Sequence, residues 1–245
     1  MDHRPWPIPA RRWVMAQRWS DLLFAHWPVA TSELRPLIPD GLELDTWAGE
    51  GWVGIVPFRM SGVRLRGTPA LPWLSAFPEL NLRTYVRVGD RPGVWFFSLD
   101  AANPVAVAIA RRWFHLPYFR ARMSCRDDDG EVIYDSRRVH RGAPAATLAA
   151  RYRPIGNVTT THEGTHEHWL TARFCLYAED GRRRLWRGEI DHPPWPLQSA
   201  TATLEYKGTA SGFGITLPDR APICHFVRTI DVRCWRPGLV TRSSI

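Results

Sequence analysis

Apolar and polar residues alternate along several short stretches of the chain, which is the pattern of strands with one buried face. Polar and apolar residues alternate in part over residues 84–88 (Thr-Tyr-Val-Arg-Val), and a mainly apolar run at 94–99 follows them after a turn. These two stretches predict a pair of neighbouring strands. Asp-Gly dipeptides at 129–130 and 180–181 predict two antiparallel hairpins. The segments that these hairpins would join are 121–125 with 132–134, and 169–177 with 185–190.

One stretch has the signals of a helix instead. Asn103 is a typical N-cap, Pro104 suits the first helical position, and a mainly apolar stretch continues to Phe114. The helix must end before Pro117, because proline disfavours helical backbone in the residue before it. The sequence therefore predicts an α+β fold that is mostly antiparallel β, with a few short helices.

The composition fits one domain over residues 1–245. Hydrophobic residues make up 44% of the chain, with 13 tryptophans and 21 prolines, which excludes a disordered or coiled-coil protein. Residues 1–10 are predicted to form an N-terminal arm, and residues 236–245 a loose C-terminal tail. The chain has neither the apolar core of a signal peptide nor a run of ~18 apolar residues, so we expect a cytoplasmic protein that does not bind membranes.

The charge of the chain is strongly positive but does not predict a nucleic-acid surface. The formal net charge is +8, and Lys207 is the single lysine among 32 basic residues. The arginines are scattered rather than clustered on one segment, so we expect no nucleic-acid partner. The four cysteines are widely spaced, without a Cys-x-x-Cys pair, and are predicted to be free thiols.

Residues 110–119 (Ala-Arg-Arg-Trp-Phe-His-Leu-Pro-Tyr-Phe) resemble the catalytic segment of acetoacetate decarboxylases, in which Gly-Arg-Glu and a hydrophobic spacer precede Pro-Lys-Lys. Arg111 and Pro117 match that pattern, whereas Tyr118 and Phe119 stand in place of the two lysines. In those enzymes one lysine condenses with a substrate ketone, and the second ammonium lowers the pKa of the first. Neither tyrosine nor phenylalanine can form an imine, so decarboxylation through a Schiff base is not expected.

Further segments extend the resemblance over most of the chain. The sequence is similar to the YqjF-like proteins, also called the domain of unknown function 2071 family, within the acetoacetate decarboxylase-like superfamily. This resemblance implies a β-barrel core. Related folds often assemble into oligomers, so the resemblance also leaves a homo-oligomer open. The segments that carry it are FAHWPV (24–29), LIPDGL (37–42), GIVPF (54–58), FPELNLRTYV (77–86) and HPPWPLQ (192–198).

Glu79 and Arg83 are the first candidate site residues, because four residues apart in an extended segment they fall on the same face. They predict either a ligand site, where arginine binds a carboxylate and glutamate exchanges a proton, or an ion pair between strands. The resemblance favours a catalytic Glu79, since a glutamate comparably upstream of the lysines belongs to the decarboxylase active site. Tyr118 would then donate a hydrogen bond to the substrate, or simply form an amphipathic wall.

Three more side chains complete the predicted substrate-binding set. Arg111 would help Arg83 to orient a carboxylate, and His115 and Phe119 would line the site. A lone histidine in a hydrophobic spacer is also typical of a satisfied core residue. Lys207 would restore imine chemistry only if it were desolvated, and we expect it to be exposed instead.

The string from His162 to His166 (His-Glu-Gly-Thr-His) matches the zinc-protease pattern, whose two histidines must lie on one helix. Residues 158–161 are β-branched and a glycine interrupts the string, so the sequence predicts an extended segment instead. There His166 and His168 would share a face and could begin a metal site. A third ligand would have to come from elsewhere, and the candidates are His192 and Glu189. We expect no metal and no other cofactor.

The leading hypothesis is a protein that binds or transforms a small organic carboxylate or carbonyl compound in an apolar pocket, without a Schiff-base lysine. If it is an enzyme, Glu79 is the general acid or base, and lyase, isomerase or hydrolase chemistry is open. The main alternative is a non-catalytic binding or sensing module that has lost the decarboxylase chemistry. A third hypothesis is a structural protein that uses its tryptophan-rich surface in an oligomer.

Overall fold

A computed structural model describes residues 3–70 and 75–241 of the chain. None of the helices in this part of the chain is long and apolar enough to cross a membrane. In chain order the elements are β1 (Met15–Val29), α1 (Thr31–Leu34), η1 (Arg35–Leu37), β2 (Glu43–Leu44), β3 (Gly51–Leu65), β4 (Phe77–Val88), β5 (Arg91–Ala101), α2 (Pro104–Trp113), β6 (Tyr118–Asp128), β7 (Glu131–Arg138), β8 (Thr147–Thr160), α3 (His166–Thr171), β9 (Cys175–Glu179), β10 (Leu185–Asp191), β11 (Pro196–Lys207), η2 (Ser211–Phe213), β12 (Ile223–Cys234) and β13 (Gly238–Leu239).

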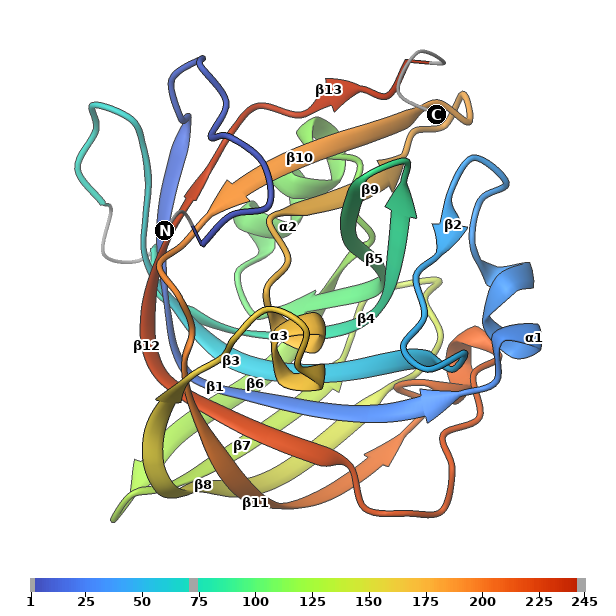
Figure 1. The fold of residues 1–245 in the computed structure, drawn as a ribbon. Coiled ribbons are helices and arrows are strands. Elements are labelled where there is room, and N and C mark those ends of the chain that lie inside the picture. Colours follow the sequence, from blue (N-terminus) through green and yellow to red (C-terminus); the bar gives the residue numbers. More distant parts are fainter. Residues whose placement is uncertain (1–2, 71–74, 242–245) are drawn as a thin grey trace.

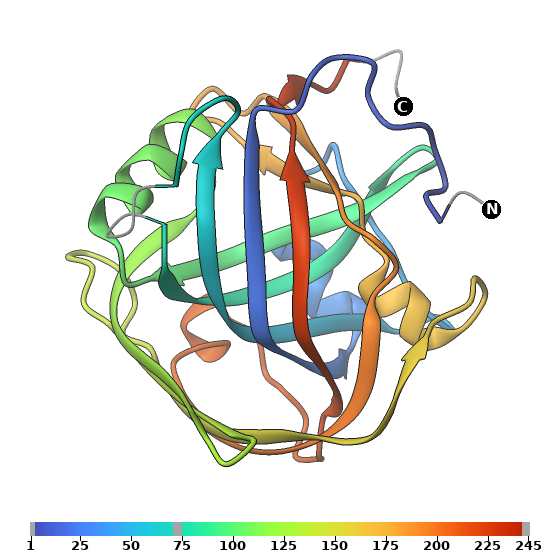
Figure 2. The same cartoon turned by 90° about the vertical axis from the view of Figure 1, so that its left-hand side faces the viewer.

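The strands form one continuous sheet that curves back on itself (Figures 1 and 2). In the described residues its order is β13-β10-β9-β5-β6-β7-β8-β11-β12-β1-β3-β4-β2. Additional pairings of β10 with β12 and of β5 with β4 join strands that are distant in this order, so the sheet is ring-like. The mostly antiparallel fold with short helices is confirmed, although β5 runs parallel to β6 and β9.

Helix α2 connects the parallel strands β5 and β6, and it begins where the sequence predicted. Parallel neighbours need a crossover of this kind, since a tight turn cannot join them. The Asn103 side chain accepts hydrogen bonds from the backbone N–H groups of Val105 and Ala106, at 3.0 and 3.1 Å. The crossover brings the start of β6 beside the end of β5, with Tyr118 opposite Leu99.

Replacing Asn103 with alanine should lower the free energy of unfolding by about 1 kcal/mol, because two backbone donors of α2 lose their acceptor. Urea unfolding followed by circular dichroism measures this difference. Asn103→Asp keeps an acceptor at the same position and should retain most of the stability. Equal stability of the alanine variant and the wild type would contradict the capping role.

The two predicted hairpins form, but their turns differ. Asp129 and Gly130 have φ angles of 53° and 81°, and they form the two-residue turn between β6 and β7. Positive φ at both positions is the geometry that Asp-Gly favours, and it suits the twist of paired strands. The connection from β9 to β10 is longer, since Glu179 pairs with Leu185. Asp180 holds this loop by accepting hydrogen bonds from the backbone of Arg182 and Arg184.

The prediction for the histidine-rich segment is wrong in part. Residues 166–171 form helix α3 rather than the start of a strand, and β9 begins at Cys175. Thr165 caps the helix by accepting a hydrogen bond from the His168 N–H. This cap stabilises a helical turn, although the β-branched residues before it favour an extended backbone. His166 and His168 therefore do not lie side by side on a strand, and His162 precedes the helix.

Both ends of the described chain are bound to the sheet. Arg4 forms ion pairs with Glu189 and Asp191 at 3.3 and 3.1 Å, and its side chain is fully buried. The Trp6 indole donates to the same Glu189 carboxylate at 2.9 Å. The predicted arm is thus docked against β10. Within the predicted C-terminal tail, Gly238–Leu239 forms strand β13 and pairs with β10, and residues 242–245 lie outside the described residues.

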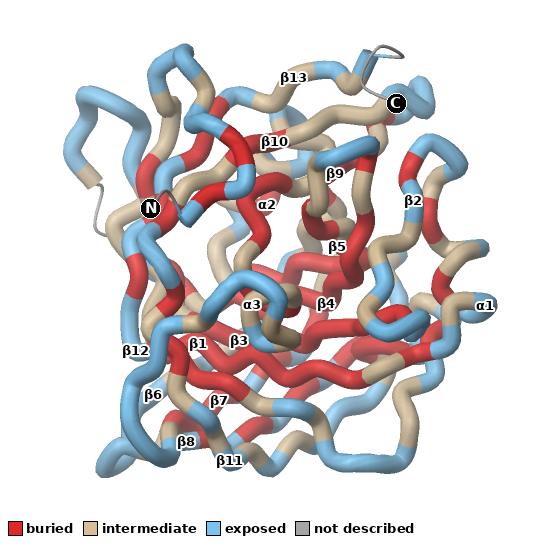
Figure 3. Tube along the Cα trace, in the orientation of Figure 1, coloured by how far each residue is buried: buried red, intermediate tan, exposed pale blue. Residues whose placement is uncertain are grey.

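Buried residues are concentrated along β1, β3, β4 and β5 (Figure 3). Strand β4 contributes to clusters on both of its faces, because successive side chains point in opposite directions. Leu80 and Leu82 pack in one cluster with Tyr134, whereas Phe77 packs in another with Val107 and Trp195. Residues 79, 81 and 83 share the face of Phe77, so polar groups interrupt an apolar layer there.

Candidate functional site

Glu79 and Tyr118 are brought together by the crossover through α2. Glu79 lies on β4, and Tyr118 is the first residue of β6. The Tyr118 hydroxyl donates a hydrogen bond to the Glu79 carboxylate at 3.0 Å, although 39 positions separate them. The Tyr134 hydroxyl fixes the backbone at the same place by donating to the Glu79 carbonyl at 2.7 Å. The convergence that the candidate site requires is therefore present for this pair.

Burial dominates the electrostatics of the pair. Glu79 is 2% exposed. Loss of hydration raises its pKa to about 8, against the lowering effect of hydrogen bonds from Tyr118 and Asn81, with Asp100 adding to the increase. Burial also raises the pKa of Tyr118 well above its usual value, and the Glu79 charge adds to that. Near neutral pH the carboxyl is thus largely protonated and the phenol keeps its proton.

Asn81 belongs to this site and was not predicted. It is 7% exposed, lies two residues after Glu79 on the same face of β4, and is a hydrogen-bonding partner of its carboxyl group. Its Oδ1 atom is buried without a hydrogen-bond partner. The period of two that linked Glu79 to Arg83 passes through Asn81, so the same argument would have identified it.

Arg83 lies on the same face but does not pair with Glu79. Its Nη2 atom donates to the Tyr85 hydroxyl at 3.3 Å and to the Leu170 carbonyl at 3.2 Å. The Tyr85 hydroxyl is also hydrogen-bonded to His26 Nε2 at 2.6 Å. The predicted ion pair is therefore absent from the described contacts, because the guanidinium turns to the carbonyl at the end of α3. Its Nε atom remains buried without a partner.

The remaining predicted residues lie in different surroundings. Arg111 is exposed, and its Nη1 atom donates to the Tyr118 carbonyl at 2.7 Å. Phe119 points away from the Glu79 side, with the Arg138 guanidinium 4.5 Å from its ring centroid. His115 packs against Trp186 at 5.4 Å and lines a separate cavity of about 310 Å³. Of the six predicted residues, only Glu79 and Tyr118 are joined by a hydrogen bond from side chain to side chain in the described structure.

A buried ion pair lies behind the crossover. Asp100 on β5 accepts hydrogen bonds from Arg138 Nε and Nη2 at 2.8 and 3.1 Å, and both side chains are almost completely buried. The paired geometry is the one in which guanidinium and carboxylate compensate each other best. Asp100 pairs along the sheet with Leu80 and Phe119, next to the two site residues. Nothing in the sequence distinguishes Arg138 from the other arginines.

The alternative nucleophile and metal ligands are placed elsewhere. Lys207 is exposed at the end of β11, which agrees with the expectation that it is solvated. His166 packs against Trp47 and Trp52, with ring centroids 5.1 and 4.3 Å apart. His192 instead stacks on Phe174 at 4.6 Å.

Comparison with known proteins identifies a family over most of the chain. The DUF2071 family model, described as "Uncharacterized conserved protein", matches residues 16–231. The uncharacterized protein YqjF of Bacillus subtilis (strain 168) is 43% identical over 228 residues, which cover 93% of each chain. The resemblance stated from the sequence segments is confirmed.

Solved structures with the same fold share little sequence with this chain. A structure of acetoacetate decarboxylase has a TM-score of 0.65 at 13% identity, covering 98% of this chain and 97% of that one. The acetoacetate decarboxylase of Legionella pneumophila gives 0.63 at 13% identity, with 98% and 94% covered. The enduracididine biosynthesis enzyme MppR, complexed with pyruvate, gives 0.62 at 14% identity, with 97% and 93% covered. These similarities establish the fold.

Proposed function

The chain belongs to the DUF2071 family and has the fold of acetoacetate decarboxylase, and from this premise we propose that it is a cytoplasmic protein that binds a small oxo acid at Glu79 and Tyr118. The observation that carries this proposal is the Glu79 carboxyl, buried and hydrogen-bonded to Tyr118, with its pKa raised by burial to about 8. A carboxyl group that titrates near neutral pH can both accept and donate a proton there.

The residues around Glu79 support acid–base chemistry without a covalent intermediate. Tyr118 would donate to the carbonyl oxygen of the ligand, and Asn81 would hold the carboxyl group that exchanges the proton. The single lysine, Lys207, is exposed and far along the chain from both, so no imine is part of the proposal. MppR is a relative in fold that is complexed with pyruvate, which makes pyruvate the first ligand to test.

The route of the ligand is proposed to pass beside α2. Neither the cavity beside His115 nor a second cavity beside α2 is lined by Glu79 or Tyr118. Val107 of α2 lines one of them and also packs in the cluster against which Tyr118 lies. A displacement of this helix would therefore connect solvent with the surroundings of the Glu79 carboxyl group.

Exchange of the pyruvate methyl protons in D2O tests the proposal, because a general base forms the enol without any co-reactant. We expect the protein to accelerate loss of the methyl proton signal, and Glu79→Gln to slow it by about 100-fold or more. Tyr118→Phe should retain weaker exchange. Tyr206→Phe, which changes an exposed tyrosine, and Lys207→Gln should match the wild type.

Ligand-observed NMR separates the proposal from its main alternative, a binding or sensing module. That alternative is favoured by Tyr118 and Phe119 in the two lysine positions. Binding of pyruvate that Glu79→Gln weakens, without proton exchange in the wild type, would support sensing. The oxo-acid proposal would be overturned if the protein neither bound pyruvate or acetoacetate nor accelerated their proton exchange.

A further inference from the structure

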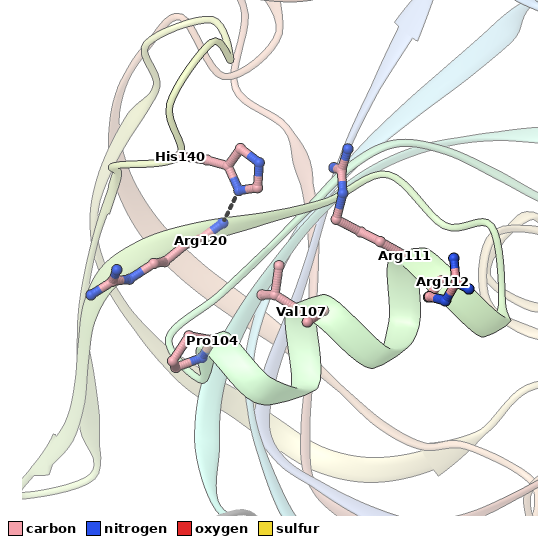
Figure 4. A pocket seen from close by; sticks show the side chains of 7 residues that line it. Pro104, Val107, Arg111, Arg112, Arg120 and His140 are labelled. Carbon is pink, nitrogen blue, oxygen red and sulfur yellow. Dashed lines mark hydrogen bonds between the residues drawn. The ribbon is translucent and has the colours of Figure 1, made fainter. Parts of the chain in front are cut away.

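A basic groove lies between α2 and the start of β6 (Figure 4). It is a cavity of about 480 Å³ that opens to solvent, and no carboxylate is among its lining residues. Val107 points into it from the helix, while the His140 ring lies on the opposite wall. The groove is lined by Pro104, Val107, Ala108, Arg111, Arg112, Arg120 and His140.

Two of the polar groups in this groove are held in place by the fold. The Tyr118 carbonyl accepts a hydrogen bond from Arg111 at 2.7 Å, and the same guanidinium lies 5.7 Å from the Phe119 ring centroid. His140 Nδ1 accepts a hydrogen bond from the Arg120 backbone N–H at 3.1 Å. Because Nδ1 is the acceptor, the neutral ring carries its proton on Nε2 and keeps a donor for a ligand.

The groove has an uncompensated positive charge. Arg111, Arg112 and Arg120 are exposed and form no ion pair with the described carboxylates, whereas the nearby Arg138 is neutralised by Asp100. The pKa of His140 is lowered by its partial burial and then by the charges of Arg111 and Arg138. Concentrated charge of one sign in a concave surface attracts small ions of the opposite sign.

We propose that this groove binds the phosphate group of a phosphate monoester. Guanidinium groups present paired donors that match phosphate oxygens, and a monoester carries close to two negative charges at neutral pH. A simple carboxylate carries one charge and would leave more of the arginine charge unbalanced. The apolar atoms of Pro104, Val107 and Ala108 form a surface for the carbon part of the ester. Glu79 does not line the groove, and phosphate binding there does not depend on the proposed oxo-acid function.

Calorimetric titration of the full chain with phenyl phosphate tests the site, at an ionic strength held constant with sodium chloride. We expect saturable binding, tighter than that of inorganic phosphate, because the ring adds contact with the apolar surface. Arg112→Gln combined with Arg120→Gln should weaken it by at least about tenfold, from the loss of charge-assisted hydrogen bonds. Both residues are exposed, so the double variant is expected to fold.

Arg122→Gln combined with Arg137→Gln is the matched control. These two arginines are exposed, face each other across β6 and β7, and do not line the groove. Their replacement removes two positive charges, as in the test variant, but from the surface outside the groove. Their loss should change affinity less than about twofold, as expected for diffuse screened charge. Equal weakening by both double variants, or no saturable binding to the wild type, would overturn the proposal.

A phosphate monoester can also be the headgroup of a lipid. Sedimentation with vesicles that contain phosphatidic acid, compared with phosphatidylcholine alone, distinguishes the two sources. Vesicle binding that is lost in the Arg112 and Arg120 variant would assign the groove to the lipid. Saturable binding of phenyl phosphate without vesicle binding would assign it to a free ester.

Discussion

Replacement of Glu79 with glutamine should make the protein more stable than the wild type at pH 8 but not at pH 5. The folded-state pKa is about 8 and the ordinary value is 4.5, so between them the folded protein retains a proton that the unfolded chain has lost. Wild-type stability therefore falls by about 1.4 kcal/mol per pH unit as the pH rises through this interval. Glutamine does not titrate and escapes this loss.

The difference in free energy of unfolding, variant minus wild type, should increase by about 3.5 kcal/mol from pH 5 to pH 8. Urea unfolding at each pH unit measures it. Glu205→Gln removes an exposed carboxylate of β11 and is the control, whose curve should run parallel to that of the wild type. A constant difference between Glu79→Gln and the wild type would show that the carboxyl group ionises without penalty, and would also remove the basis for its acid–base role.

Replacement of Asp100 with asparagine should cost about 3–5 kcal/mol of stability at neutral pH, because Arg138 would remain buried with its charge uncompensated. Both side chains of the pair are at most 2% exposed, so solvent cannot replace the lost partner. Arg138→Met should be destabilising to a similar degree. Chemical unfolding of each single variant measures the two costs.

The double variant Asp100→Asn with Arg138→Met should cost less than the sum of the single changes, since no unpaired charge remains. Arg151 and Glu131 form an exposed ion pair at 3.2 Å and provide the comparison. Arg151→Met should change stability by less than about 1 kcal/mol, as solvent screens such pairs. Additive costs at Asp100 and Arg138 would contradict a direct coupling between them.

Local signals predicted the elements that local interactions stabilise. Asn103 and Pro104 fixed the start of α2, and Asp129-Gly130 fixed the turn between β6 and β7. Helix α3 was missed because it has only six residues, and its end depends on distant side chains. Trp195 donates to the Thr171 carbonyl at 2.8 Å, and Arg83 donates to the Leu170 carbonyl. Contacts of this kind leave no periodic pattern in the sequence.

The sequence predicted some residues of the candidate site correctly and misplaced others. Glu79 and Tyr118 were found because the resemblance aligned them with a catalytic segment, and the crossover through α2 brings them into contact. The strand period placed Arg83 correctly on the face of Glu79, but it could not indicate which way a long side chain would turn. Arg111 was assigned to the same site from its position in the segment, whereas the helix directs it into the basic groove.

The pairing of β1 with β12, which come from opposite ends of the chain, has a consequence for synthesis on the ribosome. Strand β1 ends at Val29 and has β3 on one side, but its other partner begins only at Ile223. At ~5–20 residues per second, the second edge of β1 stays unpaired for about 10–40 seconds in a nascent chain. The face of β1 that becomes buried is apolar, and unpaired strand edges beside such a face tend to pair with other chains. Chaperone contact during translation is therefore most valuable for the first strand of this protein.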